Sequence, residues 1–136
     1  MDYGTSITLD QPFDETVEAT RAALVDQGFG VLTEIDVQAT MKAKLDVDVE
    51  PQLILGACNP QLARQALAID PGIGLLLPCN VVVRRSAGLT IVSALDPQVM
   101  VSLPDNPDLQ GVADEAERRL SAVLESLGGT PVTADR

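Results

Sequence analysis

The sequence predicts an α+β domain of two layers, a single sheet with its helices packed mainly on one face. Its 136 residues have the size of one ordinary domain and show no internal repeat or linker. Short strand-like runs and amphipathic stretches follow one another in the order strand, helix, strand, short helix, strand, helix, strand, strand, helix. The uninterrupted Val-Val-Val at 81–83 is typical of a strand buried on both faces, so the sheet centre is expected there.

The first strand and the first long helix follow from periodicity. Residues 5–9 alternate polar and apolar side chains, as a half-buried strand does. Asp10, Gln11 and Pro12 open a helix that carries acidic residues in its first turn and stops at Gly28. The apolar residues expected on or near one face of this helix are Phe13, Val17, Leu24 and Val25.

The next strand and a short helix occupy residues 29–45. Residues 29–36 are expected to form a strand with Val31, Thr33 and Ile35 on one side. A short helix over 37–45 follows, because apolar residues recur there at four-residue spacing. These residues are Val37, Met41 and Leu45.

The segment 51–83 organises the rest of the chain. Residues 52–58 form a short apolar run, a buried strand that ends at Asn59-Pro60. The Asn side chain can accept from a free backbone N–H group of the first helical turn, and Pro has no backbone N–H group that would be left unpaired there. A helix is therefore expected to start at Asn59-Pro60 and to end at Asp70-Pro71-Gly72. Gly72-Ile73-Gly74 is interpreted as a turn that returns residues 75–77 to the core, ahead of the Val81 strand.

The C-terminal third adds one hairpin partner and one long helix. Residues 84–88 are expected to connect to a strand over 89–95, with one more helical turn near 98–103. Apolar positions at helical spacing from Leu109 to Leu127 then predict a long amphipathic helix closed by Gly128-Gly129. The core of the domain is therefore expected over about 5–127, with 130–136 as a frayed tail.

Composition excludes several function classes. The net charge of −11 repels a phosphate backbone, and aromatic residues make up only 2% of the chain, so nucleic-acid binding is not expected. No apolar run approaches the roughly 20 residues that cross a bilayer, and a cytoplasmic location is expected. The chain has no histidine, which removes histidine-activated nucleophiles and imidazole metal ligands. No complete catalytic constellation remains, so the sequence assigns no reaction.

The candidate site is a set of four residues: Cys58, Asn59, Cys79 and Lys44. Cys58 precedes the expected helix start, where the dipole can favour a thiolate, although packing as a small apolar residue is the more ordinary role. Cys79 lies near Cys58 only if their strands are neighbours, which the sequence leaves open. Two thiols fill half of a tetrahedral zinc site, so neither a metal nor a cofactor is expected. Lys44 and Lys42 are interpreted as part of a solvent-exposed helix face, and the alternative is that they bind an anion.

Several of these motifs, taken together, resemble those of the bacterial and archaeal family of domain of unknown function 302. They are Glu-Ile-Asp-Val at 34–37, Cys-Asn-Pro at 58–60, Leu-Leu-Leu-Pro-Cys-Asn-Val at 75–81 and Asp-Pro at 96–97, and the resemblance extends over about 6–127. It implies a β-α-β(4)-α two-layer sandwich of the kind called TT1751-like, and a homodimer. It supplies no activity, substrate or catalytic residue.

Three functional hypotheses remain. The first is a homodimeric binding module whose small-molecule or protein ligand lies near the Cys58 helix start or in a dimer groove. The second is thiol-dependent redox or sulfur handling, with Cys58 reactive and Cys79 as resolving partner. In the third and weakest, Lys42 or Lys44 captures an anion together with the helix start at Asn59.

Overall fold

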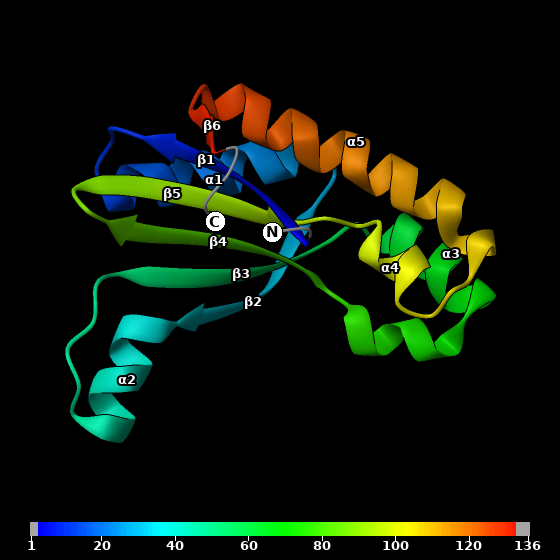
Figure 1. Cartoon of the computed structure of the whole chain (residues 1–136), viewed down its shortest axis with the longest axis horizontal. Coiled ribbons are helices and arrows are strands. Elements are labelled where there is room, and N and C mark those ends of the chain that lie inside the picture. Colours follow the sequence, from blue (N-terminus) through cyan, green and yellow to red (C-terminus); the bar gives the residue numbers. More distant parts are fainter. Residues whose placement is uncertain (1–2, 133–136) are drawn as a thin grey trace.

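Six strands form one antiparallel sheet in the order β2-β3-β4-β5-β1-β6 (Figure 1). The structure is a computed structural model that describes residues 3–132. The strands are β1 (Gly4–Leu9), β2 (Gly30–Asp36), β3 (Gln52–Cys58), β4 (Cys79–Ser86), β5 (Leu89–Leu95) and β6 (Thr130–Val132). Since β4 lies in the interior of this order, the prediction that residues 81–83 run through the sheet centre is confirmed.

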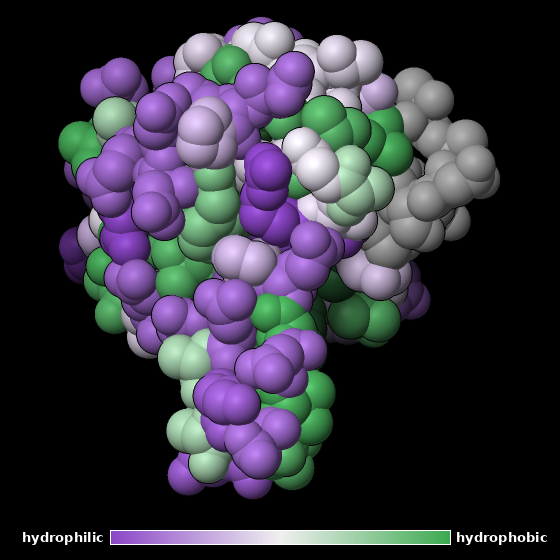
Figure 2. Space-filling view, turned by 90° about the vertical axis from the view of Figure 1, so that its left-hand side faces the viewer, coloured by the Kyte–Doolittle hydropathy of each residue, from purple (hydrophilic) through white to green (hydrophobic). Residues whose placement is uncertain are grey.

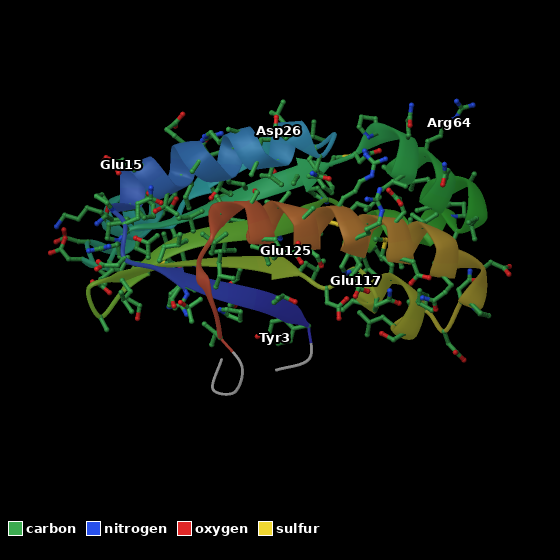
Figure 3. The ribbon with its side chains drawn as sticks, turned by 90° about the horizontal axis from the view of Figure 1, so that it is seen from above. Tyr3, Glu15, Asp26, Arg64, Glu117 and Glu125 are labelled. Atoms are coloured by element: carbon green, nitrogen blue, oxygen red, sulfur yellow. The ribbon has the colours of Figure 1, made fainter. Side chains whose placement is uncertain are left out.

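The helices form the second layer, with one exception. They are α1 (Phe13–Asp26), α2 (Val37–Leu45), α3 (Pro60–Ile69), α4 (Val99–Ser102) and α5 (Gln110–Leu127), with 3₁₀ turns η1 (Pro71–Leu76) and η2 (Pro107–Leu109). α1 and α5 pack together over one face of the sheet, and α3 continues this layer beyond the sheet end (Figures 1 and 3). α2 stands apart at the β2 edge (Figure 1). The predicted two-layer α+β class is confirmed.

The core lies between the sheet and the helical layer and is aliphatic. Alternate residues of β3, β4 and β5 turn toward the helices and are fully buried, among them Leu55, Val81, Val83 and Val92. With so few aromatic side chains, the core depends on many small, closely packed contacts. Deleting methylene groups there is therefore costly.

α1 buries a different set of residues than its apolar pattern predicts. Val17 and Leu24 are buried as expected, but Val25 is 66% exposed. Two threonines take the inner positions instead. The Thr16 hydroxyl donates to the Pro12 carbonyl at 2.9 Å, and the Thr20 hydroxyl donates to the Thr16 carbonyl at 2.7 Å. Because each hydroxyl is satisfied within its own helix, threonine can occupy the core side.

The expectation that a turn returns residues 75–77 to the core is confirmed for Leu76 and Leu77, which pack against the core, and is wrong for Leu75. The turn is the 3₁₀ helix η1, in which the Asp70 side chain accepts from the Gly72 amide at 3.0 Å. Ile73 is the buried anchor of the turn, whereas Leu75 is 92% exposed. The tight 3₁₀ spacing places these two side chains on different sides of the backbone.

A β-bulge changes which side chains of β2 face the helices. Val31 pairs with Ala57 and Thr33 pairs with Gly56, so Leu32 is an extra residue. The predicted common side for Val31, Thr33 and Ile35 is therefore wrong. After the bulge Glu34 turns toward α1, where Arg21 Nη2 donates to its carboxylate at 2.6 Å.

The predicted helix over 37–45 is confirmed, but none of its residues is buried. Of its apolar stripe, Val37 and Met41 are half-buried and Leu45 is 65% exposed, so the described chain covers the stripe only in part. The frayed tail predicted over 130–136 is wrong for Thr130–Val132, which pair with β1 as β6, and residues 133–136 lie outside the described residues. Within residues 3–132 no helix is long and apolar enough to cross a membrane.

Candidate functional site

The candidate site lies where β3 ends and α3 begins. β3 ends at Cys58, Asn59 takes the N-cap position and Pro60 is the first helical residue, as the sequence predicts. The Asn59 Oδ1 atom accepts from the Leu62 amide at 3.1 Å and so satisfies one of the free N–H groups of the first turn. The predicted junction is confirmed.

The Asn59 side chain also holds two helices in place. Its Nδ2 atom donates to the Gly28 carbonyl at 3.1 Å, which joins the end of α1 to the start of α3. Gly28 has φ +83, and a Cβ there would lie 2.8 Å from Arg119 Nη1. Arg119 in turn donates to the Gln27 carbonyl at 3.0 Å, which adds α5 to the junction. Because both the oxygen and the nitrogen of the Asn59 side chain are hydrogen-bonded within the protein, its role here is structural.

A small apolar cavity lies beside this junction and is partly open to solvent. It is formed by side chains from β3, α3, β4, α4 and α5. The lining residues are Phe29, Ala57, Cys58, Asn59, Leu62, Ala63, Ala66, Leu77, Cys79, Met100, Val112 and Ala116. The cavity volume is about 20 Å³. The cavity as it stands therefore holds a group the size of a water molecule or a methyl.

The structure brings the two cysteines together. β3 and β4 are neighbouring strands, and Cys79 pairs with Ala57, the residue next to Cys58. Both cysteines are free thiols that line the same cavity; Cys79 is buried and Cys58 is half-buried. The question that the sequence left open is answered: the cysteines are adjacent.

The environment of the two thiols favours their protonated form. Burial raises the pKa of Cys58. Burial, and then the charge of a nearby Cys58 thiolate, raise the pKa of Cys79 to about 11. The pKa of Cys58 is shifted in the opposite direction to the sequence expectation, in which the α3 N-terminus favours a thiolate. Burial favours the neutral thiol at both positions.

Lys44 is not part of this junction. It lies on α2, at the opposite end of the molecule from α3 (Figure 1). Its neighbour Lys42 forms ion pairs with Asp46 at 3.0 Å and Asp48 at 3.3 Å. The structure therefore does not place either lysine where it can share an anion with the helix start at Asn59.

Sequence reasoning missed the part of the cavity wall that α4 and α5 supply. Met100 comes from the single turn α4, and Val112 and Ala116 come from α5. The four-residue spacing of Val112 and Ala116 indicates a buried face, but not which other element that face contacts. Among residues 3–132, no group of three or more His, Cys, Asp or Glu side chains is arranged to hold a metal ion.

Comparisons with known proteins agree on one family. The model of the family described as domain of unknown function DUF302 matches residues 5–127. The chain is also similar to the crystal structure of an uncharacterized conserved DUF302 protein from Bacillus stearothermophilus, with 31% sequence identity and a TM-score of 0.85. That similarity covers 92% of this chain and 98% of the other. No curated protein matches the chain.

Proposed function

The chain belongs to the DUF302 family, and with this premise we propose that it is a homodimeric binding module for a small molecule. The observation that carries the proposal is the apolar cavity at the β3–α3 junction, which is partly open to solvent and lined by two thiols. Ligand sites in proteins are typically apolar hollows with few polar groups. The junction that forms one wall is rigid, because Asn59 ties α3 to α1.

The size of the cavity limits the class of ligand. About 20 Å³ of accessible space admits a methyl or thiol group, whereas typical pockets for whole small molecules measure roughly 300–1,000 Å³. The proposed ligand therefore inserts one small apolar end beside Cys58 and Cys79 and leaves its remaining atoms at the surface. Histidine, metal and unpaired charge play no part in this recognition.

Filling the cavity tests the proposal. Ala63 lines it from α3, so Ala63→Leu adds three carbons to the space that the ligand end occupies. Ala68→Leu is the matched control, because Ala68 lies on the exposed side of the same helix. Both variants and the wild type are screened against a metabolite panel by thermal shift, and hits are checked by native mass spectrometry. We expect ligands that stabilise the wild type and A68L but not A63L.

Two outcomes would count against binding at this cavity. One is a hit that stabilises A63L as much as the wild type, which would place the ligand elsewhere. The other is a broad panel, including apolar thiols and short-chain acids, in which no compound stabilises the wild type.

A second candidate function is favoured by the adjacency of the two cysteines. In a thiol-dependent redox or sulfur-handling role, the more exposed Cys58 attacks a substrate disulfide as the thiolate, which forms a mixed disulfide and releases one substrate thiol. The Cys79 thiolate on the neighbouring strand then attacks the Cys58 sulfur, which closes a Cys58–Cys79 disulfide and releases the second substrate thiol, so the substrate disulfide is the oxidant. The raised pKa of both thiols opposes this role in the closed structure, because the thiolate is the nucleophile.

Alkylation rates separate the two functions. Each thiol is measured alone, in Cys79→Ser and Cys58→Ser, from pH 6 to pH 10. A packing role predicts slow reaction at pH 7, with Cys58 faster than Cys79. Neither rate is expected to level off near the ordinary cysteine pKa of about 8.5, because both pKa values are raised. Rapid reaction of Cys58 at pH 7 would instead support the thiol-dependent function.

A further inference from the structure

One face of the sheet is not covered by α1, α3 or α5, and we propose that this face and α2 form a surface that binds a second copy of the chain. The register of the strands identifies the side chains on this open face, because alternate residues point to opposite sides. They are Gly4, Ser6, Thr8, Thr33, Ile35, Gln52, Ile54, Gly56, Asn80, Val82, Arg84, Ser86, Leu89, Ile91, Ser93, Leu95, Thr130 and Val132.

The open face contains no carboxylate. None of its residues is Asp or Glu, and its single charged side chain is Arg84, although the whole chain has 20 acidic residues. The acidic side chains labelled in Figure 3, Glu15, Asp26, Glu117 and Glu125, belong to α1 and α5 in the helical layer. Charge is therefore distributed unevenly between the two sides of the molecule.

Apolar side chains occupy the middle of the open face. Ile54 and Val82 are cross-strand partners, and Ile91 lies on the adjoining strand; all three are only half-buried. Ile35, at the β2 edge next to α2, is 49% exposed. These side chains form an apolar surface that continues toward α2.

α2 extends this surface. It is nine residues long with no buried residue, and a helix of that length is marginal in water without packing. Leu45 is 65% exposed, and Val47 and Val49 in the segment that follows are also exposed. Figure 2 shows α2 as a lobe at the bottom of the molecule, with hydrophobic surface on its right-hand side, the side to which the open face also turns. One partner surface can therefore contact both.

The area of this surface matches that of a stable dimer. The strands are about 4.8 Å apart; five are about 20 Å or more in length and β6 is about 10 Å, which gives the sheet face roughly 500–600 Å². One side of α2 adds roughly 130 Å², from nine residues at 1.5 Å each and a width of about 10 Å. A standard interface buries about 800 Å² of accessible surface per partner, which exceeds the flat area because surfaces are rough.

The charge distribution identifies the partner as a second copy. Two chains that each carry −11 repel one another wherever carboxylates meet. The open face of the sheet has none, and the exposed Asp46 and Asp48 beside α2 are both paired with Lys42. A basic partner would instead be drawn to the helical layer. A two-fold symmetric dimer that joins the two open faces keeps both acidic layers outside. This inference deepens the homodimer of the proposed function and is independent of the ligand cavity.

New carboxylates on the surface provide the test. Ile91→Glu and Val82→Glu place a charge in the middle of the open face, and Leu45→Glu places one on α2, outside the core. Val25→Glu is the matched control, because Val25 is exposed on α1 in the helical layer. Sedimentation velocity across a concentration series measures the dimer dissociation constant, and circular dichroism checks that each variant is folded. We expect I91E and V82E to weaken the dimer by roughly 100-fold or more, L45E to weaken it less, and V25E to leave it unchanged.

Two results would overturn the inference. A wild-type chain that stays monomeric at high concentration rejects the dimer itself. A dimer that survives in folded I91E, V82E and L45E, but not in V25E, places the interface on the helical layer. The ligand screen is repeated on monomeric I91E, whose cavity is intact, so that failure of the interface and failure of the ligand site are distinguished.

Discussion

Replacing Asn59 by alanine removes two hydrogen bonds, one that caps α3 and one that joins the start of α3 to the end of α1. The first is the N-cap bond to the Leu62 amide at 3.1 Å, and such caps contribute about 1 kcal/mol. The second is the bond from Nδ2 to the Gly28 carbonyl at 3.1 Å, which is partly buried and contributes about 0.5–1.5 kcal/mol. We therefore expect Asn59→Ala to lower the free energy of unfolding by roughly 2 kcal/mol, a large share of the total for a small domain.

Urea unfolding followed by circular dichroism measures this change, and two further variants divide it. Asn59→Ser keeps an oxygen that can cap α3 but loses the bond to Gly28, so its loss is expected to be about half that of N59A. Gln61→Ala is the control, because Gln61 is exposed in the first turn of α3. It is expected to stay within about 0.5 kcal/mol of the wild type. An N59A variant as stable as Q61A would refute the role assigned to this junction.

Two other predictions concern close packing and acid stability. A Cβ on Gly56 would overlap the Thr33 side-chain oxygen on β2, so Gly56→Ala is expected to lower the free energy of unfolding by about 1–3 kcal/mol, measured in urea. Gly111→Ala, in a helix position with nothing nearby, is expected to stabilise by about 0.5–1 kcal/mol; equal effects of the two would contradict the contact. The side chains of Arg118 and Arg119 hold the pKa of Glu115 at about 2, below its ordinary 4.5. The stability it contributes is thus present above pH 4.5 and lost as the pH falls toward 2, so Glu115→Gln should flatten that part of the pH profile.

Local signals in the sequence were sufficient for most of the fold. The Asn59-Pro60 pair determines where α3 starts through the chemistry of one amide and one imino acid, and the same chemistry operates in the structure. The Val-Val-Val run at 81–83 indicated the sheet interior for an equally local reason, because a strand buried on both sides needs no polar alternation.

The errors arose where tertiary contacts decide between local alternatives. Leu75 and Ile73 are both apolar, and only the 3₁₀ geometry of η1 determines that Ile73 is buried. Val25 fits an apolar stripe on α1, but two threonines with internal hydrogen bonds occupy the buried side instead. Neither outcome can be read from hydropathy alone, since the hydropathy of a residue does not depend on its partners.

The candidate site was predicted in part. The position of Cys58 at the strand end followed from the capping signal beside it. The adjacency of Cys79 required the pairing of β3 with β4, and the contribution of Met100 required the docking of α4, and both are long-range contacts. The direction of the thiol pKa shift also depended on burial, which a helix-start motif does not specify.

The bulge in β2 has a consequence for association. With regular pairing after Val31, Glu34 would stand opposite Ile54 and point away from the helices, next to the apolar centre of the sheet. The one additional residue, Leu32, rotates Glu34 to the other side, where Arg21 neutralises it. This one-residue bulge thus keeps negative charge off the face proposed to bind a second copy of the chain. Regular pairing of Leu32 with Gly56 would instead place the Glu34 carboxylate on that face.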